Sequence, residues 1–342
     1  MNKPLSKEYL LNRGYCCNNK CFNCPYTKNN MKNNYIIGAG PAGLIAAYYM
    51  KDYKVIDKSP LGQLRAPFIP GPRLLQATPN METLIKELFP DWWINIQTAK
   101  VGYLENEVTT DIPSKGFKSK YVEKTRGTSA IEGSHLSEGK NEIDHIELGA
   151  MSQESYAKVF NRLLEIIKER GQLIEKHIEN IDIGNKTITF AGDGNDVGLT
   201  TFYDKIVSTI NLNILSKLAP EMDIDLTELT TKGKSFYKTD YGSSESMSKP
   251  AYKHSYVYSA DTEWTRKTYF DSYIVYESVE PIASKTIEGN NVEMKFENLP
   301  IQIVKSKNID SVNGIKMLGR FAQWNHKIKA NEALDRVISW IS

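Results

Sequence analysis

The chain has 342 residues, of which 40% are hydrophobic and 25% are charged, values that suit a globular protein of about two domains. This composition excludes a fully disordered chain, a collagen and a small protein held by many disulfides. There are 43 lysines and arginines against 41 aspartates and glutamates, so the net charge is +2. The overall charge therefore gives no case for a nucleic acid or an anionic membrane as the main partner.

The first segment, residues 1–30, is a polar head that contains all four cysteines of the chain: Cys16, Cys17, Cys21 and Cys24. Cysteines packed this tightly make poor long-range disulfides, but they can converge on one metal. The candidates are zinc and an iron–sulfur cluster, and the alternative is a patch of free cysteines. The N-terminus lacks the apolar core of a signal peptide, and no apolar run is long enough to cross a membrane. We therefore expect a cytoplasmic protein with reduced thiols.

A strand–turn–helix–strand unit follows the head. Tyr35–Ile37 is a short apolar strand, Gly38–Gly43 is a glycine-rich turn, Leu44–Lys51 is an apolar helix, and Lys54–Asp57 is the next strand. In a dinucleotide fingerprint the first glycine permits the turn, the second lets the backbone approach a pyrophosphate, and the third lets helix and strand pack closely. An acid at the end of the second strand can bind ribose hydroxyls. The sequence therefore predicts a nucleotide-binding unit.

The rest of the chain divides into a polar stretch and further elements. Residues 105–149 show little periodicity and are interpreted as a polar insertion. Apolar residues at helical spacing predict a helix over Ser152–Arg170. The later predicted elements are strands at Leu173–Ile183, Lys186–Phe190 and Tyr203–Ile210, a helix at Asn211–Leu218, an antiparallel sheet within Tyr252–Glu280 and a last helix at Asn331–Trp340.

Several patches, in the same order along the chain, resemble FAD enzymes of the amine-oxidase and UDP-galactopyranose-mutase kind. The patches are Tyr35–Gln63, His177–Asn180, Phe202–Ile210, Tyr258–Arg266 and Leu318–Trp324. In such enzymes the C-terminal part returns to the nucleotide unit, so that the chain wraps a long cofactor. An NAD enzyme of the ordinary type would more often place a second βαβ half directly after the first.

The resemblance implies an α/β fold with a Rossmann-like FAD-binding domain of the glutathione-reductase type and an antiparallel-sheet substrate domain. The head would be residues 1–30, the FAD-binding domain residues 31–104, 150–220 and 300–342, the insertion residues 105–149, and the substrate domain residues 221–299. The head itself resembles a small cysteine-rich module attached to some oxidoreductases.

The resemblance also implies site residues. The predicted FAD ligands are Gly38, Gly40, Pro41, Ala42, Gly43, Asp57, Lys58, Gln63, Ile178, Gly319, Arg320 and Phe321. The predicted substrate residues are Arg73, Tyr258, Trp264 and Arg266. Arg73 lies where the mutases carry a histidine, which suggests an anionic ligand because a guanidinium suits a carboxylate or phosphate. The alternative for each arginine is a pair with a structural carboxylate.

The expected function is an FAD-dependent oxidoreductase, in which the flavin removes a hydride from a small anionic substrate that carries an amine or alcohol. No side chain is assigned a catalytic role, and His254 and His326 are interpreted as surface or structural residues. The alternatives are a mutase-like enzyme acting on a nucleotide sugar and a flavin-binding regulatory protein. The expected partner is a small molecule, and neither a membrane partner nor a particular oligomeric state is indicated.

Overall fold

The structure is a computed structural model that describes residues 33–61, 74–125, 141–149, 152–192, 198–224, 231–240, 256–270, 273–280, 290–303 and 305–342, with Leu226, Leu229 and Ile282. The four cysteines of the predicted head lie outside these residues, as do Gln63, Arg73 and His254.

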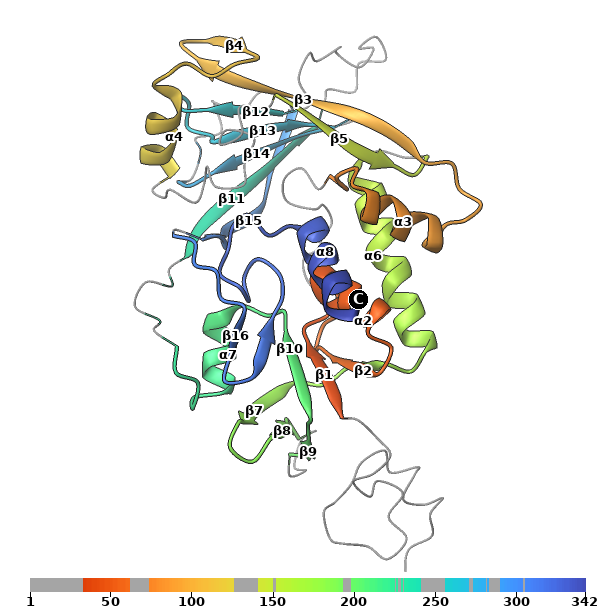
Figure 1. The fold of residues 1–342 in the computed structure, drawn as a ribbon. Coiled ribbons are helices and arrows are strands. Elements are labelled where there is room, and N and C mark those ends of the chain that lie inside the picture. The colour runs from red at the N-terminus through yellow and green to blue at the C-terminus, as the bar shows by residue number, and fades with distance from the viewer. Residues whose placement is uncertain are drawn as a thin grey trace, which may run out of the picture.

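One half of the structure is built around a six-stranded sheet (Figure 1). The strand order is β16-β17-β10-β1-β2-β6, and the pairs from β17 to β6 are parallel. Its strands are β1 (Asn34–Ile37), β2 (Tyr53–Ile56), β6 (Leu173–Ile174), β10 (Lys205–Ser208), β16 (Ser311–Val312) and β17 (Ile315–Met317). Segments from both ends of the chain therefore meet in one sheet.

Two apolar layers enclose this sheet because successive side chains of each strand point to opposite faces. Ile36 packs with the helices on one face, whereas Tyr35 and Ile37 pack on the other. The first face carries α2 (Pro41–Tyr49), α3 (Pro79–Leu88), α6 (Ser152–Glu169) and α8 (Ala330–Ile341). The second carries α7 (Leu212–Leu218) and a small sheet of β7 (Ile178–Asp182), β8 (Thr187–Phe190) and β9 (Thr200–Phe202).

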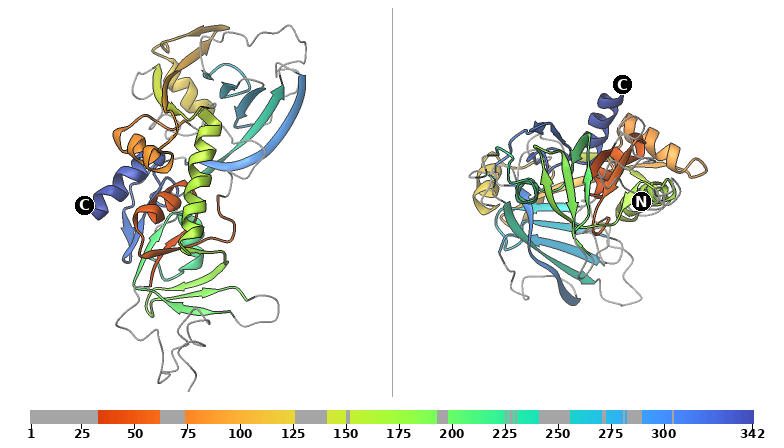
Figure 2. Two further views of the ribbon diagram at one scale, coloured as in Figure 1. Left: turned by 90° about the vertical axis from the view of Figure 1, so that its right-hand side faces the viewer. Right: turned by 90° about the horizontal axis from the view of Figure 1, so that it is seen from below.

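A larger sheet forms the other half and lies beyond one end of the parallel sheet (Figures 1 and 2). Its order is β15-β11-β14-β13-β12-β3-β4, with β5 paired to β3. The strands are β3 (Asn95–Glu105), β4 (Val108–Thr110), β5 (Glu142–Glu147), β11 (Thr231–Asp240), β12 (Tyr256–Ser259), β13 (Arg266–Tyr269), β14 (Tyr273–Ser278) and β15 (Asn290–Ile303). All pairs are antiparallel except β12 with β3, which is parallel.

The sequence predicted most of these elements. The first βαβ unit, the helix after Ser152, the antiparallel strands of Tyr252–Glu280 and the last helix are confirmed. The predicted lack of regular structure in residues 105–149 is wrong. That stretch contains β4, β5 and α4 (Phe117–Thr125), because Phe117, Tyr121 and Ile143 are buried against the large sheet. The domain boundaries stay a prediction, although the one at residue 104 falls inside β3.

In the part of the chain that the structure describes, no helix combines the length and apolarity that crossing a bilayer requires.

Candidate functional site

The glycine-rich turn lies where β1 ends and α2 begins, and two of its glycines are required by the packing. Gly38 has a φ of +101°, and a Cβ there would lie 2.5 Å from Thr209 Oγ1. A Cβ on Gly43 would lie 1.9 Å from the carbonyl oxygen of Gly38. Both distances are far below van der Waals contact, so the third glycine lets α2 pack closely against the turn, and the first leaves room for Thr209, which follows β10.

Gly40 differs from these two glycines because a Cβ there would meet no described atom within 4 Å. It is the N-cap residue of α2, Pro41 takes the first helical position, and no side chain caps this end of the helix. The uncapped N-terminus of a helix offers N–H donors and partial positive charge. The turn therefore has the space and the polarity that a pyrophosphate needs.

Asp57 follows β2 and accepts a hydrogen bond from the same turn. Its Oδ2 accepts a hydrogen bond of 2.6 Å from the main-chain N–H of Ala39, and its Oδ1 accepts one of 2.7 Å from that of Ser59. Each carboxylate oxygen has a second acceptor position. Asp57 thus fixes the turn and is still able to accept a hydrogen bond from a ribose hydroxyl, whereas the neighbouring Lys58 is exposed.

The C-terminal segment returns to this turn. The N–H of Leu318 donates to the carbonyl of Ser208 at 2.9 Å. A Cβ on Gly319, whose φ is +92°, would lie 2.9 Å from the Cβ of Ala42 at the start of α2. Residues almost 280 positions apart therefore lie side by side, as the resemblance implied. The other predicted FAD residues near the parallel sheet are the buried Ile178, which begins β7, and the half-buried Arg320 and Phe321.

The predicted substrate residues Tyr258 and Arg266 lie opposite each other in the large sheet. Tyr258 of β12 pairs with Arg266 of β13, which pairs in turn with Glu277 of β14. The Tyr258 ring is only 5% exposed and stacks on Tyr103, with ring centroids 6.1 Å apart. Its other ring neighbour is Tyr121 of α4, at 5.5 Å. Trp264 is not part of this row and packs against Tyr276 instead.

Arg266 forms an ion pair with Glu277, the structural alternative considered above. The Nε of Arg266 donates to Glu277 Oε1 at 2.6 Å, and its Nη2 contacts the same oxygen. The Glu277 side chain is fully buried, and Lys234 Nζ of β11 lies 3.4 Å from Oε2. Burial alone would raise the pKa of Glu277, but Arg266 and Lys234 outweigh it and hold that pKa below its usual range.

His326 lies near the same charges, although it belongs to the C-terminal segment. Its Nδ1 is buried and has no hydrogen-bond partner among the described residues. Its pKa is held well below the usual value, first by burial and then by the positive charges of Arg320, Lys234, Arg266 and Lys329. The imidazole is therefore neutral and unsuited to gain a proton.

We call Lys234, Arg266, Glu277, Arg320 and His326 the charged cluster. Its residues come from the large sheet and from the C-terminal segment beyond β17, and it contains one buried carboxylate, Glu277, with Lys234 and Arg266 beside it. Such a surplus of positive charge, away from bulk water, favours an anionic group.

Sequence reasoning singled out Arg266 and Arg320 in the charged cluster but missed the roles of Lys234, Glu277 and His326. One signal for Glu277 was available, because it is the only charged residue in the otherwise apolar and aromatic stretch Tyr273–Ser278. A lone carboxylate in a strand with that composition indicates a buried partner of opposite charge.

Among the described residues there is no group of three or more histidine, cysteine or acidic side chains arranged to hold a metal ion. The cysteine site of the head lies outside those residues and stays a prediction.

Comparison by sequence gives little. A family of unknown function, DUF5522, matches residues 5–30, the segment predicted as a separate head. No curated protein matches the chain.

Comparison by structure gives more. A reduced UDP-galactopyranose mutase matches with a TM-score of 0.62 at 12% identity, covering 91% of this chain and 93% of that one. Putrescine oxidase bound to putrescine matches with a TM-score of 0.58 at 11% identity, covering 91% and 99%. Cyclohexylamine oxidase from Brevibacterium oxydans IH-35A matches with a TM-score of 0.52 at 9% identity, covering 91% and 99%. Both kinds of enzyme that the sequence resembles are thus among the matches, and the chain shares their fold.

Proposed function

We propose that this protein binds FAD and is an oxidoreductase that takes a hydride from a small anionic substrate carrying an amine or an alcohol. The observation that supports this most is the open Gly40 turn, with the uncapped N-terminus of α2 on one side and Gly319 beside Ala42. The fold shared with an amine oxidase and a mutase supports the same class.

The residues present fit FAD. The main chain at Gly40 and the first turn of α2 would hold the pyrophosphate, and Asp57 would accept a ribose hydroxyl. When bound, the flavin supplies the hydride acceptor. The protein binds and orients the flavin and the substrate, and we assign the anionic part of the substrate to the charged cluster. There Lys234 and Arg266 keep Glu277 ionised, while the neutral His326 offers an unpartnered Nδ1.

The first test is the visible spectrum of the purified protein, with and without added FAD. We expect flavin absorption and about one FAD per chain. Gly40→Val should weaken FAD binding at least about tenfold, because its side chain would enter the space of the pyrophosphate. Gly116→Val is the matched control. A Cβ at Gly116 also meets no described atom within 4 Å, but Gly116 lies just before α4 and far from the turn in sequence. A colourless protein that takes up no FAD would overturn the proposal.

The second test separates the kinds of flavoprotein. Anaerobic mixing with amine or alcohol substrates that carry a carboxylate should bleach the flavin if hydride transfer occurs. Turnover of a nucleotide sugar only after chemical reduction of the flavin would indicate the mutase-like alternative. Full FAD occupancy with neither activity would indicate a flavin-binding regulatory protein.

A further inference from the structure

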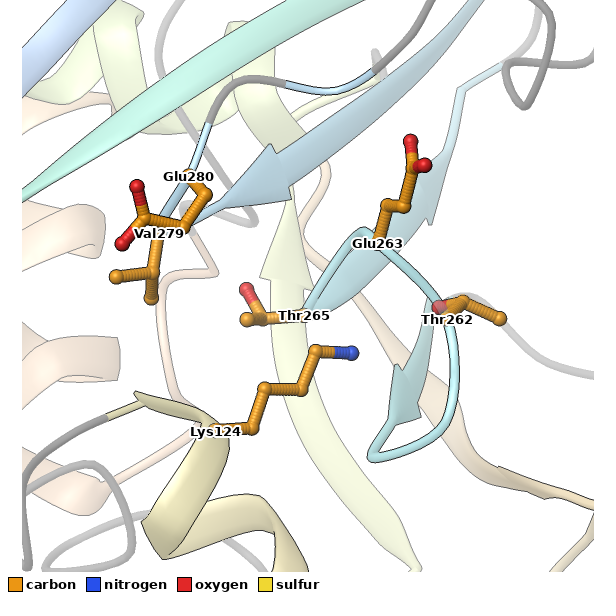
Figure 3. A pocket seen from close by; sticks show the side chains of 6 residues that line it. All are labelled: Lys124, Thr262, Glu263, Thr265, Val279 and Glu280. Atoms are coloured by element: carbon orange, nitrogen blue, oxygen red, sulfur yellow. The ribbon is translucent and has the colours of Figure 1, made fainter.

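A cavity separate from the glycine turn lies beside the C-terminal end of α4. Its volume is about 270 Å³, and its lining residues are Lys124, Thr262, Glu263, Thr265, Val279 and Glu280. They come from α4, from the turn between β12 and β13, and from the end of β14 (Figure 3). None of them is among the residues to which the proposed function assigns a role.

Lys124 is held in place at this cavity by the main chain. Its Nζ donates to the carbonyl of Ser259 at 2.9 Å and to that of Trp264 at 2.6 Å. Figure 3 shows the side chain extending from α4 towards the turn that carries Thr262 and Thr265. Among the residues that the structure describes, no carboxylate is its hydrogen-bond partner. The amine is therefore held by neutral acceptors, which stabilise its charged form less than an ion pair would.

The pKa of the Lys124 amine is lower than is usual for a lysine. Burial lowers the pKa of Lys124 to about 8, although the charge of Asp261 acts in the opposite direction. Asp261 is itself 3.7 Å from Lys120, and among the described residues the other charged side chains that line the cavity are those of the exposed Glu263 and Glu280. Near pH 8 a larger fraction of the Lys124 side chains is therefore neutral than for an ordinary lysine.

The geometry suits a neutral amine as well as a charged one. A neutral amine has two N–H bonds and one lone pair, and the two carbonyls accept both N–H bonds. The lone pair then stays available on the nitrogen. A desolvated lysine with a free lone pair is a nucleophile for carbonyl carbons.

We propose that Lys124 captures a small aldehyde in this cavity as an imine. The nitrogen lone pair adds to the carbonyl carbon, and a proton passes from nitrogen to the former carbonyl oxygen. Water then leaves with that oxygen, and the C=N bond forms. The step changes no oxidation state and needs no further reactant. It does not depend on the flavin proposal.

The surrounding hydrogen bonds tolerate this product. The imine forms as a neutral group without an N–H and then takes up a proton from solvent. The protonated imine has one N–H, so one of the two carbonyls loses its bond to Lys124. The Trp264 carbonyl also accepts a hydrogen bond of 2.9 Å from Thr262 Oγ1, and it therefore keeps a donor. The remaining N–H of Lys124 can stay on the Ser259 carbonyl, and neither acceptor is left unsatisfied.

The test uses the whole purified chain, propionaldehyde and cyanoborohydride, which reduces an imine to a stable alkyl amine. Peptide mass spectrometry then measures the modified fraction of each lysine between pH 6.5 and 9.5. Lys120 is the internal control, because it lies one turn earlier on α4 and its side chain is 55% exposed. At pH 8, an amine of pKa about 8 is about a hundredfold more deprotonated than an ordinary lysine. An amine of lower basicity is also a weaker nucleophile, which offsets part of this gain in the deprotonated fraction. We therefore expect Lys124 to react about tenfold faster than Lys120.

A variant tests whether the cavity takes part. Val279→Phe enlarges one residue of the cavity wall and leaves Lys124 and the residues of its two carbonyl partners unsubstituted. It should slow modification of Lys124 at least fivefold and leave Lys120 unchanged. Equal rates at Lys124 and Lys120 at pH 8 in the natural chain would overturn the proposal. An unchanged rate at Lys124 in Val279→Phe would overturn it as well, because the aldehyde would then reach the amine without the cavity.

Discussion

Glu277 is the residue on which the charged cluster depends, because its carboxylate compensates two cations at once. Its side chain is fully buried, and it contacts Arg266 and Lys234. Breaking a buried ion pair by removing one partner leaves an uncompensated charge and costs about 3–5 kcal/mol. We expect Glu277→Gln to lower the free energy of unfolding by about that amount, measured by urea denaturation. Glu280→Gln, at an exposed position two residues beyond β14, should have almost no effect.

The pH dependence of this contribution has a definite sign. The pKa of Glu277 is lowered in the folded protein, so the stabilisation is present above the unfolded value of about 4.3. It is lost as the pH falls through the lower folded value. An equal loss of stability from Glu277→Gln at pH 7 and at pH 3 would contradict the ion pair.

A second prediction concerns His326 and the dependence of stability on pH in a different pH range. Its pKa is well below 6.5 when folded, so below about pH 6.5 the unfolded chain binds a proton that the folded chain does not. Stability should therefore fall as the pH decreases from 6.5, by at most about 1.4 kcal/mol per pH unit for one group. His326→Gln should remove this slope between pH 5 and 6.5 in denaturant titrations. His177→Gln, at an exposed position, is the control, and an unchanged slope in His326→Gln would contradict the burial of the ring.

Individual residues were predictable from the sequence where local geometry decides. Gly38 and Gly43 follow from the fingerprint, because the turn needs a positive φ at Gly38 and a close approach of the chain at Gly43. Asp57 was predicted as a ribose ligand, and its hydrogen bond to the turn was not predicted. The charged cluster was not predictable as a whole. Lys234 and Glu277 are more than 40 positions apart and meet only because β11 pairs with β14. The register between two such strands is set by the whole sheet, and it cannot be predicted from a local sequence pattern.

At the scale of elements, Gln172 joins α2 to the strands beside it. It is 5% exposed and lies just before β6. Its Nε2 donates to the carbonyl of Tyr53 at 2.8 Å and is within 3.3 Å of that of Ala47 and 3.4 Å of that of Lys51. These carbonyls are at the end of α2 and the start of β2, where no helical partner remains.

We therefore expect Gln172→Leu to lower the free energy of unfolding by about 1–3 kcal/mol, because buried carbonyls would lose their donor. Hydrogen exchange at the amides of α2 and β2 should rise with it. Glu175→Leu is a control three residues further on, at a half-exposed side chain. A stability loss below 0.5 kcal/mol in Gln172→Leu would show that water replaces the amide.

The helices differ in how well the sequence predicts them. The apolar residues of α6 recur at helical spacing over five turns, so its bounds were predicted to within one residue. Helix α4 is different, because among its nine residues only Phe117, Tyr121 and Thr125 are buried. So narrow an apolar stripe is a weak signal in a helix that also carries three lysines, and the helix is stable because the large sheet covers that stripe.

At the scale of the whole molecule, the half built around the parallel sheet is assembled from segments far apart in the chain. β1 has β2 on one side and β10 on the other, and β17 follows β10. The resemblance predicted this return, whereas composition and periodicity alone do not, because they carry no information on which strands pair. The parallel sheet thus depends on both ends of the described chain, and β1 begins only at Asn34.

Removal of residues 1–32 should therefore leave the fold and FAD binding intact, since both sheet neighbours of β1 are retained. We expect the melting temperature and the FAD content of the 33–342 chain to equal those of the full chain. Loss of FAD binding would show that the head contributes to the nucleotide site. The same pair of proteins tests the cysteine prediction, since elemental analysis after anaerobic purification should find about one zinc or one iron–sulfur cluster only in the full chain. Equal metal content in both would contradict a site formed by Cys16, Cys17, Cys21 and Cys24, because the shortened chain contains none of these four thiols.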